Sequence, residues 1–162
     1  MTEFLLDSFL LHRHPEFISG SIHTNHNSII MNLLLIAIGG ALGSIARYLS
    51  SEAIISLVKT NNSLVAKFPW GTFFVNVLGS MIAGILYYFV IKNFDNFDPR
   101  LKVFLFAGFL GGFTTFSAFS LDFFRLASAG QYSQALLYAF ASVAISIMAL
   151  FFGFYSTKLI IS

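Results

Sequence analysis

Four long apolar segments, joined by short polar connections, account for most of the chain. They lie at about 33–55, 71–91, 101–124 and 134–159. An α-helix needs roughly 20 apolar residues to cross the hydrocarbon core of a bilayer, and each segment is about that long. Because lipid offers no hydrogen bonds to exposed peptide groups, such segments are expected to be helical. The pattern predicts an all-α integral membrane protein with four transmembrane helices.

The third segment is interrupted near its centre. Its residues 108–120, GFLGGFTTFSAFS, contain three glycines and four hydroxyl residues where the segment should lie at mid-membrane depth. Non-helical backbone persists at that depth only where it faces protein, a bound ion or a water-filled path. We therefore predict a broken third helix with a role in ion handling. The exposed carbonyls of 111–114 would coordinate a cation, although the same glycines also suit a plain kink at a close helix contact.

Small residues are spaced for close helix contacts on the first two segments. Gly39 and Gly43 on the first, and Ser80 and Gly84 on the second, are four residues apart. This arrangement lets another helix approach closely. We expect both segments to pack tightly against other helices.

The composition agrees with a membrane protein and excludes several other classes. Hydrophobic residues make up 57% of the chain, charged residues 10%, and the mean hydropathy is +0.81, whereas soluble domains carry about 25% charged residues. The net charge is +2 with a pI near 9.0, but the basic residues are scattered singly, so nucleic-acid binding is not expected. The chain has no cysteine, which excludes disulfides, thiolate metal sites and a cysteine nucleophile.

Residues 1–30 differ from the rest of the chain. They are largely polar and hold all four histidines, His12, His14, His23 and His26. We expect a poorly ordered N-terminal extension, 1–30, followed by a four-helix domain, 31–162. The apolar stretch within the extension is too brief for a signal peptide. A metal site is one interpretation of the histidines, but solvated tail histidines are the commoner case, and Met31 is a candidate start of translation.

The basic residues near the ends of the predicted helices are divided evenly between the two sides of the membrane. One side receives Lys92, Arg100, Lys102 and Lys158, and the other receives Arg47, Lys59, Lys67 and Arg125. Orientation follows the bias of Lys and Arg between short loops, so a chain without bias is expected to insert in both directions. Two opposite copies would form an antiparallel homodimer, with the inverted symmetry that many transporters build from internal repeats.

Polar side chains recur at four-residue steps on the second and fourth segments. Thr72 and Asn76 share one face of the second, and Tyr138, Ser142 and Ser146 share one face of the fourth. Polar groups are costly against lipid and tend to face other helices or a wet path, where hydroxyl and amide donors would replace the water around an anion. The alternative is that each hydroxyl bonds to a carbonyl of its own helix or packs between helices.

Two phenylalanines and one arginine are further candidates for anion handling. Phe116 and Phe119 lie three residues apart after the interruption and so share a face. The electropositive edges of their rings would solvate a small anion without a full charge that would trap it. With 21 phenylalanines in the chain, lipid contact or core packing is the alternative. Arg47 lies near the end of the first segment, where it either snorkels to the interface or draws anions into a vestibule.

The sequence argues against catalysis and against proton coupling. The segments contain no Ser/His/Asp set, no phosphate-binding loop and no paired carboxylates at bilayer depth, so an enzyme is not expected. A proton-coupled multidrug exporter of the small four-helix type needs a glutamate deep in its first helix, and here no carboxylate precedes Glu52 in that segment. A non-transporting assembly factor, in which the glycines serve only helix packing, is a third hypothesis.

Three ordered motifs resemble those of the small fluoride channels called Fluc or CrcB. They are GGALGSIARY at 39–48, PWGTFFVNVLGSMIAG at 69–84 and GFLGGFTTFSAFS at 108–120, and the similarity covers about 31–159. The resemblance implies a passive fluoride exporter of the cell inner (plasma) membrane. It also implies an antiparallel dual-topology homodimer with two pores and a structural sodium ion, Na+, buried at the dimer interface. A passive pore would let the negative membrane potential expel fluoride, which is ionised at cytoplasmic pH.

The resemblance further implies roles for individual residues. The sodium-coordinating carbonyls fall on Gly111 and Thr114, and two copies of each would give four oxygens. The pore asparagine, the threonine one turn before it, the paired pore phenylalanines, the hydroxyl track and the vestibule arginine fall on Asn76, Thr72, Phe116, Phe119, Tyr138, Ser142, Ser146 and Arg47. Asp122 stands where the family commonly has glutamate, and Phe113 and Ala118 replace the usual Leu and Thr.

Overall fold

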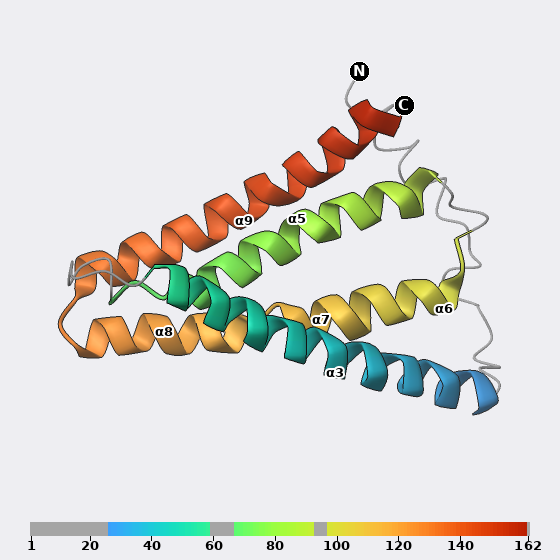
Figure 1. The fold of residues 1–162 in the computed structure, drawn as a ribbon, viewed down its shortest axis with the longest axis horizontal. Helices are drawn as coiled ribbons and strands as arrows, with labels where there is room; N and C mark the ends of the chain where they lie inside the picture. The colour runs from blue at the N-terminus through green and yellow to red at the C-terminus, as the bar shows by residue number, and fades with distance from the viewer. Residues whose placement is uncertain (1–25, 59–66, 93–96, 162) are drawn as a thin grey trace, which may run out of the picture. The chain divides into compact units, whose positions relative to one another are not determined.

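The structure of the chain, a computed structural model, describes residues 26–58, 67–92 and 97–161. Within these ranges the regular secondary structure is helical (Figure 1): α3 (His26–Leu57), α5 (Trp70–Lys92), α6 (Pro99–Lys102), η1 (Val103–Leu110), α7 (Gly111–Phe113), α8 (Phe116–Ser128) and α9 (Tyr132–Ile161). Four stretches are long and apolar enough to cross a membrane: His26–Leu57, Trp70–Lys92, Pro99–Ser128 and Tyr132–Ile161. Over the described ranges, the prediction of an all-α fold with four helical segments suited to crossing a membrane is confirmed.

The chain divides into two compact units, Met1–Met31 and Asn32–Ser162, and the candidate site lies in the second. Helix α3 begins at His26, earlier than the start at 33 that the sequence predicts. Residues 1–25, which include the other three histidines, lie outside the residues that the structure describes, and so does Lys59 of the charge comparison. The order and role of the N-terminal extension therefore stay predictions.

The third candidate span starts at a proline cap and continues as a π-helix. Asp98 Oδ1 accepts the backbone N–H of Arg100 at 2.8 Å, and Pro99 occupies a first-turn position where a missing N–H is harmless. After α6, the eight residues Val103–Leu110 form the π-helix η1. Turns of π-helix are rare and often lie at functional sites. Nothing in the hydrophobic pattern distinguishes this segment from an α-helix.

Two extended residues separate α7 from α8. The Leu110 carbonyl accepts the N–H of Thr114 at 2.9 Å, and the helical conformation then ends, because Thr114 has ψ 157° and Thr115 has ψ 119°. Helix α8 starts at Phe116, with Thr115 as its N-cap: Thr115 Oγ1 accepts the N–H of Ala118 at 3.2 Å. Figure 1 shows the extended segment between the two helices. It lies inside the candidate span Pro99–Ser128.

Helices α5 and α9 lie side by side (Figure 1) and approach closely through glycines. A side chain at Gly84 would overlap the carbonyl of Leu150, and a side chain at Gly153 would overlap the carbonyl of Met81. In a membrane, lipid removes the hydrophobic drive for helix association, so close contact through small residues takes its place. Gly84 has the packing role that its spacing predicts.

Helix α3 packs against η1 and α7 through a second set of glycines. A Cβ atom at Gly39 would stand 3.0 Å from the Cα atom of Gly108, and one at Gly43 would overlap the carbonyl of Phe109. A Cβ atom at Gly112 would in turn overlap the carbonyl of Gly40. Gly39 and Gly43 are buried. The close contact predicted for this pair of glycines is confirmed.

Substitution of two adjacent glycines of α3 tests this contact. In Gly39→Ala the new methyl group would meet the Phe104 carbonyl at 2.7 Å and the Phe109 nitrogen at 2.9 Å, both rigid backbone atoms. In Gly40→Ala the nearest atom to the new methyl group would be the Gly108 carbonyl oxygen, at 3.9 Å, which is an ordinary contact. We expect Gly39→Ala to lower the free energy of unfolding by about 1–3 kcal/mol, the usual cost of overpacking, and Gly40→Ala to leave it unchanged or higher. Titration with SDS measures both, and equal values for the two variants would contradict the packing described.

Candidate functional site

Asn76 of α5 is bonded through both ends of its amide to one residue of the extended segment. Its Oδ1 accepts the backbone N–H of Thr115 at 2.9 Å, and its Nδ2 donates to the Thr115 carbonyl at 3.1 Å. This pair satisfies both main-chain groups of an extended residue that has no helical partner, which matters where water is scarce. It also determines the orientation of the amide, because a flipped amide would set donor against donor. Asn76 thus joins α5 to the third span at the point where the helical conformation of the third span stops.

Two carbonyls of the third span lose their usual helical partners. In a continuous helix the Thr115 N–H would bond to the Gly111 carbonyl, and the Ala118 N–H would bond to the Thr114 carbonyl. Here the first N–H donates to Asn76 Oδ1 and the second to Thr115 Oγ1. The resemblance assigns a cation to these same two carbonyls. Oxygens with free lone pairs suit a hard cation such as sodium, so the residues present fit that site.

A cavity of about 340 Å³ opens beside the extended segment. It brings together six residues that the sequence analysis selects: Asn76, Thr114, Phe116, Phe119, Ser142 and Ser146. They come from α5, α8, α9 and the extended segment, so distant parts of the sequence meet in one place. Ser80 of α5 also lines this cavity, although the sequence analysis gives it only a packing role.

The two selected phenylalanines differ in how they are held. Their ring centroids lie 5.4 Å apart. Phe119 also lies 5.2 Å from the ring of Tyr138 and packs against the small core formed by Leu126, Ala135 and Tyr138. Phe116 is 78% exposed. The ring of Phe119 is therefore fixed by packing, whereas the ring of Phe116 lines the cavity from an uncovered position.

Two hydroxyls of α9 are buried without a hydrogen-bond partner among the described residues: Tyr138 Oη and Ser142 Oγ. The side chains of Thr72 and Ser142 lie near enough to the Tyr138 hydroxyl for weak polar contacts, and the charge of Asp122 is also near it, but none of these contacts has the geometry of a hydrogen bond. Ser142 is only 5% exposed and still does not bond to its own helix. The alternative in which hydroxyls bond to nearby carbonyls is thus wrong for Ser142.

The same alternative holds elsewhere on α9. Near its C-terminal end, Thr157 Oγ1 donates to the Gly153 carbonyl at 2.7 Å, and Ser156 Oγ donates to the same carbonyl at 3.2 Å. These two hydroxyls therefore bond to the backbone of their own helix. The contrast marks the hydroxyls beside the cavity as exceptional.

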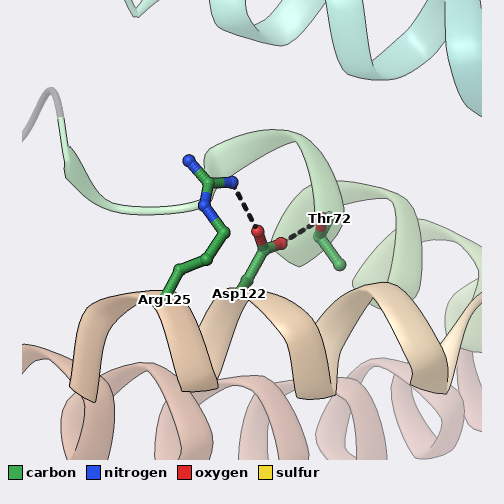
Figure 2. Close-up of polar contacts among 3 residues, drawn as sticks. All are labelled: Thr72, Asp122 and Arg125. Atoms are coloured by element: carbon green, nitrogen blue, oxygen red, sulfur yellow. Dashed lines mark hydrogen bonds and ion pairs between the residues drawn. The ribbon is translucent and has the colours of Figure 1, made fainter. Parts of the chain in front are cut away.

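Thr72 of α5 bonds to a carboxylate and does not line the 340 Å³ cavity. Figure 2 shows its hydroxyl pointing at Asp122 of α8, and Thr72 Oγ1 donates to Asp122 Oδ2 at 2.6 Å. Arg125 Nη1 contacts the other oxygen, Oδ1, at 3.2 Å. The Asp122 side chain is 13% exposed and that of Arg125 is 74% exposed. Asp122, which the sequence analysis leaves without a role, therefore joins α8 to α5.

Arg47 of α3 lines a second cavity, of about 540 Å³. Glu52, Thr72, Thr115 and Ser117 also line it. Thr115 lines the first cavity as well, so the extended segment lies between the two. Arg47 thus has an acidic neighbour, Glu52, in the same cavity, and its role at a vestibule stays a prediction.

Thr115 and Ser117 are the main residues that sequence reasoning misses. Their hydroxyl oxygens lie 3.0 Å apart, and Thr115 is bonded to Asn76, Ala118 and Ser117 together. Threonine directly before a helix is a common N-cap, and this local signal could have identified Thr115. No local signal identifies the partner of Asn76, which is 39 residues away in the sequence.

Comparison with known proteins gives one family. Residues 34–154 match the family described as "CrcB-like protein, Camphor Resistance (CrcB)". A protein of Rhizobium meliloti (strain 1021) named "Fluoride-specific ion channel FluC" is 46% identical over 122 residues, which cover 75% of this chain and 92% of the relative. A protein of the same name from Hahella chejuensis (strain KCTC 2396) is 39% identical over 132 residues, 82% of this chain and 98% of the relative. "Fluoride-specific ion channel FluC 1" of Nitrobacter hamburgensis is 43% identical over 122 residues, 75% and 90% of the two chains.

Substitutions at Thr72 test the bond between α5 and α8. Thr72→Val keeps the shape of the side chain but leaves a half-buried carboxylate oxygen without its donor. We expect it to lower the free energy of unfolding by about 1–3 kcal/mol, while Thr72→Ser, which keeps the hydroxyl, remains close to wild type. Arg125→Ala should cost at most about 1 kcal/mol, because exposed ion pairs contribute little. SDS titration of the three variants checks the order, and a larger loss for Arg125→Ala than for Thr72→Val would contradict it.

Proposed function

The chain belongs to the CrcB family, and on that basis we propose that it is a fluoride-selective ion channel that exports fluoride passively. Its relatives from three bacteria carry the name of fluoride-specific ion channels. The four helices of membrane-spanning length support the same function. The relatives are channels and not enzymes, which agrees with the expectation that this chain has no catalytic activity.

The observation that carries the proposal is the buried hydroxyl of Ser142, which lines the 340 Å³ cavity without a hydrogen-bond partner among the described residues. The hydroxyl of Tyr138, one turn earlier on α9, is also buried without such a partner, although Tyr138 does not line this cavity. A buried donor without an acceptor costs about 1–3 kcal/mol, so a protein retains one only where another group pairs with it. Fluoride is small and holds its water tightly, and hydroxyl donors at Tyr138, Ser142 and Ser146 would compensate it for the water it loses. An apolar packing cluster at this place would need no hydroxyls at all.

The aromatic residues support an anion as the occupant. Phe116 and Phe119 line the same cavity, and the edges of aromatic rings are weakly electropositive. Ring edges stabilise an anion less strongly than a cationic side chain does, so the ion can also leave, as conduction requires. Arg47 would raise the local concentration of anions at the mouth formed by the second cavity.

A second copy of the chain is proposed as the partner, in an antiparallel dual-topology homodimer. Equal numbers of basic residues near the helix ends on the two sides of the membrane leave neither orientation of the chain favoured. Phe116 lines the cavity while 78% exposed, and Gly111 is exposed beside the extended segment. An opposite copy that covers this face would enclose both, and would repeat the cavity on the other side to give two pores.

A structural sodium ion is proposed at the carbonyls of Gly111 and Thr114. The described residues contain no cluster of His, Asp or Glu side chains suited to a metal, so backbone oxygens are the natural ligands for a cation here. When bound, sodium supplies a positive charge that draws together the carbonyls of the two subunits. The chain's own contribution is to hold these two carbonyls out of the helical hydrogen-bond pattern.

Passive transport is favoured over proton coupling. The runner-up, a proton-coupled exporter of the small four-helix type, needs a carboxylate in the middle of its first helix, and α3 has none before Glu52. Passive export places the protein in the inner (plasma) membrane, where the negative potential drives fluoride outward.

A flux assay tests the proposed function. Purified protein in liposomes should release fluoride down an imposed gradient and release essentially no chloride, because a path that strips water from fluoride does not suit the larger ion. Ion-selective electrodes measure both anions, with empty liposomes as the control. Comparable chloride release would contradict the selectivity, and no release of either ion would favour the non-transporting assembly factor.

A further inference from the structure

The amide of Asn76 has more partners than a pore donor requires. An asparagine side chain carries one acceptor oxygen and two N–H donors. The oxygen and one of the donors are taken by the main chain of Thr115. Asn76 nevertheless lines the 340 Å³ cavity, and its second N–H makes no further hydrogen bond among the described residues. One side chain thus contacts both the proposed anion path and the extended segment.

The hydroxyl of Thr115 acts on the following turn in the same way. It accepts the N–H of Ala118 at 3.2 Å, the group that would otherwise close a bond to the Thr114 carbonyl. Asn76 therefore accepts the Thr115 N–H that would otherwise donate to the Gly111 carbonyl. Thr115 Oγ1 accepts the Ala118 N–H that would otherwise donate to the Thr114 carbonyl. Each of the two proposed sodium ligands is matched by one side chain that keeps its helical partner away.

We infer that Asn76 and Thr115 are positioning residues for the cation site, which they form by competing for the two backbone N–H groups that would otherwise occupy the carbonyls of Gly111 and Thr114. The inference rests on the proposed function for the identity of the cation. Asn76 would then have two roles: its amide would donate to the anion path, and it would position the Gly111 carbonyl of the cation site. Loss of that side chain would allow the Thr115 N–H to return to the Gly111 carbonyl and the helix to close across the extended segment.

The physical basis is a competition between hydrogen bonds of similar strength. Neutral hydrogen bonds differ little in their net contribution, so a helical bond and a side-chain bond to the same N–H are close in free energy. Asn76 makes two bonds to Thr115, where the closed helix would offer that N–H one. Residues that hold metal ligands in place typically change metal affinity about 10–100-fold when they are removed, and we expect an effect of that size.

The test measures sodium binding separately from transport. The melting temperature of the full-length protein in detergent is followed as sodium replaces N-methylglucamine at constant ionic strength. Wild type should gain stability with sodium, because an ion that binds only the folded protein raises the melting temperature of that protein. In Asn76→Leu, which matches the size of the amide but has no polar atoms, the sodium concentration for half of the effect should rise about 10–100-fold.

Three further variants make the result specific. Asn76→Asp keeps an acceptor for the Thr115 N–H but loses the donor to the Thr115 carbonyl, so its sodium response should lie between those of wild type and Asn76→Leu while fluoride flux falls. Thr115→Val removes the cap at nearly constant shape and should weaken the sodium response, whereas Thr115→Ser should keep it. Ser146→Ala, which lies in the same cavity but bonds to no residue of the extended segment in the described structure, should also keep it. If Asn76→Leu does not fold, Thr115→Val decides.

The failure of this inference differs from that of the proposed function. A sodium response in Asn76→Leu and Thr115→Val equal to that of wild type would overturn the positioning role and leave the channel and its sodium ion intact. Absence of any response in wild type would overturn the sodium site and this inference with it. The fluoride flux of wild type, measured on the same preparation, shows whether the channel itself stands.

Discussion

The constraint on which the structure depends is that every peptide group within a lipid bilayer needs a partner from the protein. A helix meets this requirement by itself, and a chain that leaves the helical conformation at Thr114 and Thr115 does not. The protein resolves the conflict with side chains. Asn76 bonds to both main-chain groups of Thr115, and the Thr115 hydroxyl caps α8. The carbonyls of residues 111–114 are left without their helical partners, and the proposed cation site uses two of them, those of Gly111 and Thr114.

The rest of the fold places α5 and α9 around this segment. Reciprocal contacts at Gly84 and Gly153 bring the two helices together, so that Asn76 on one and Ser142 on the other line the same cavity. Glycines of α3 hold η1 and α7 in the same manner. The bond from Thr72 to Asp122 then fastens α8 beyond the extended segment (Figure 2). Close backbone contacts and a few polar bonds therefore position the site, with little buried apolar core.

Features with a local cause could be predicted from the sequence, and features that depend on distant partners could not. The four spans are predictable because each apolar run is as long as the bilayer thickness requires. The close contact at Gly39 and Gly43 is predictable from the spacing of the two glycines. The π-helix η1 has the same apolar pattern as an α-helix and left no signal. Asn76 and Thr72 were selected as polar residues on one face, but their partners lie 39 and 50 residues away. Asn76 lines the 340 Å³ cavity, whereas Thr72 bonds to the Asp122 carboxylate. Their shared face on α5 does not indicate this difference in role.

An experimental density map of the wild-type protein in lipid and sodium tests the central claim most directly, at a resolution that shows the direction of each carbonyl. The account predicts the amide of Asn76 against the main chain of Thr115, with the carbonyls of Gly111 and Thr114 turned out of the helix toward a common density. A continuous helix through Thr114 and Thr115, with the Thr115 N–H bonded to the Gly111 carbonyl, would contradict it.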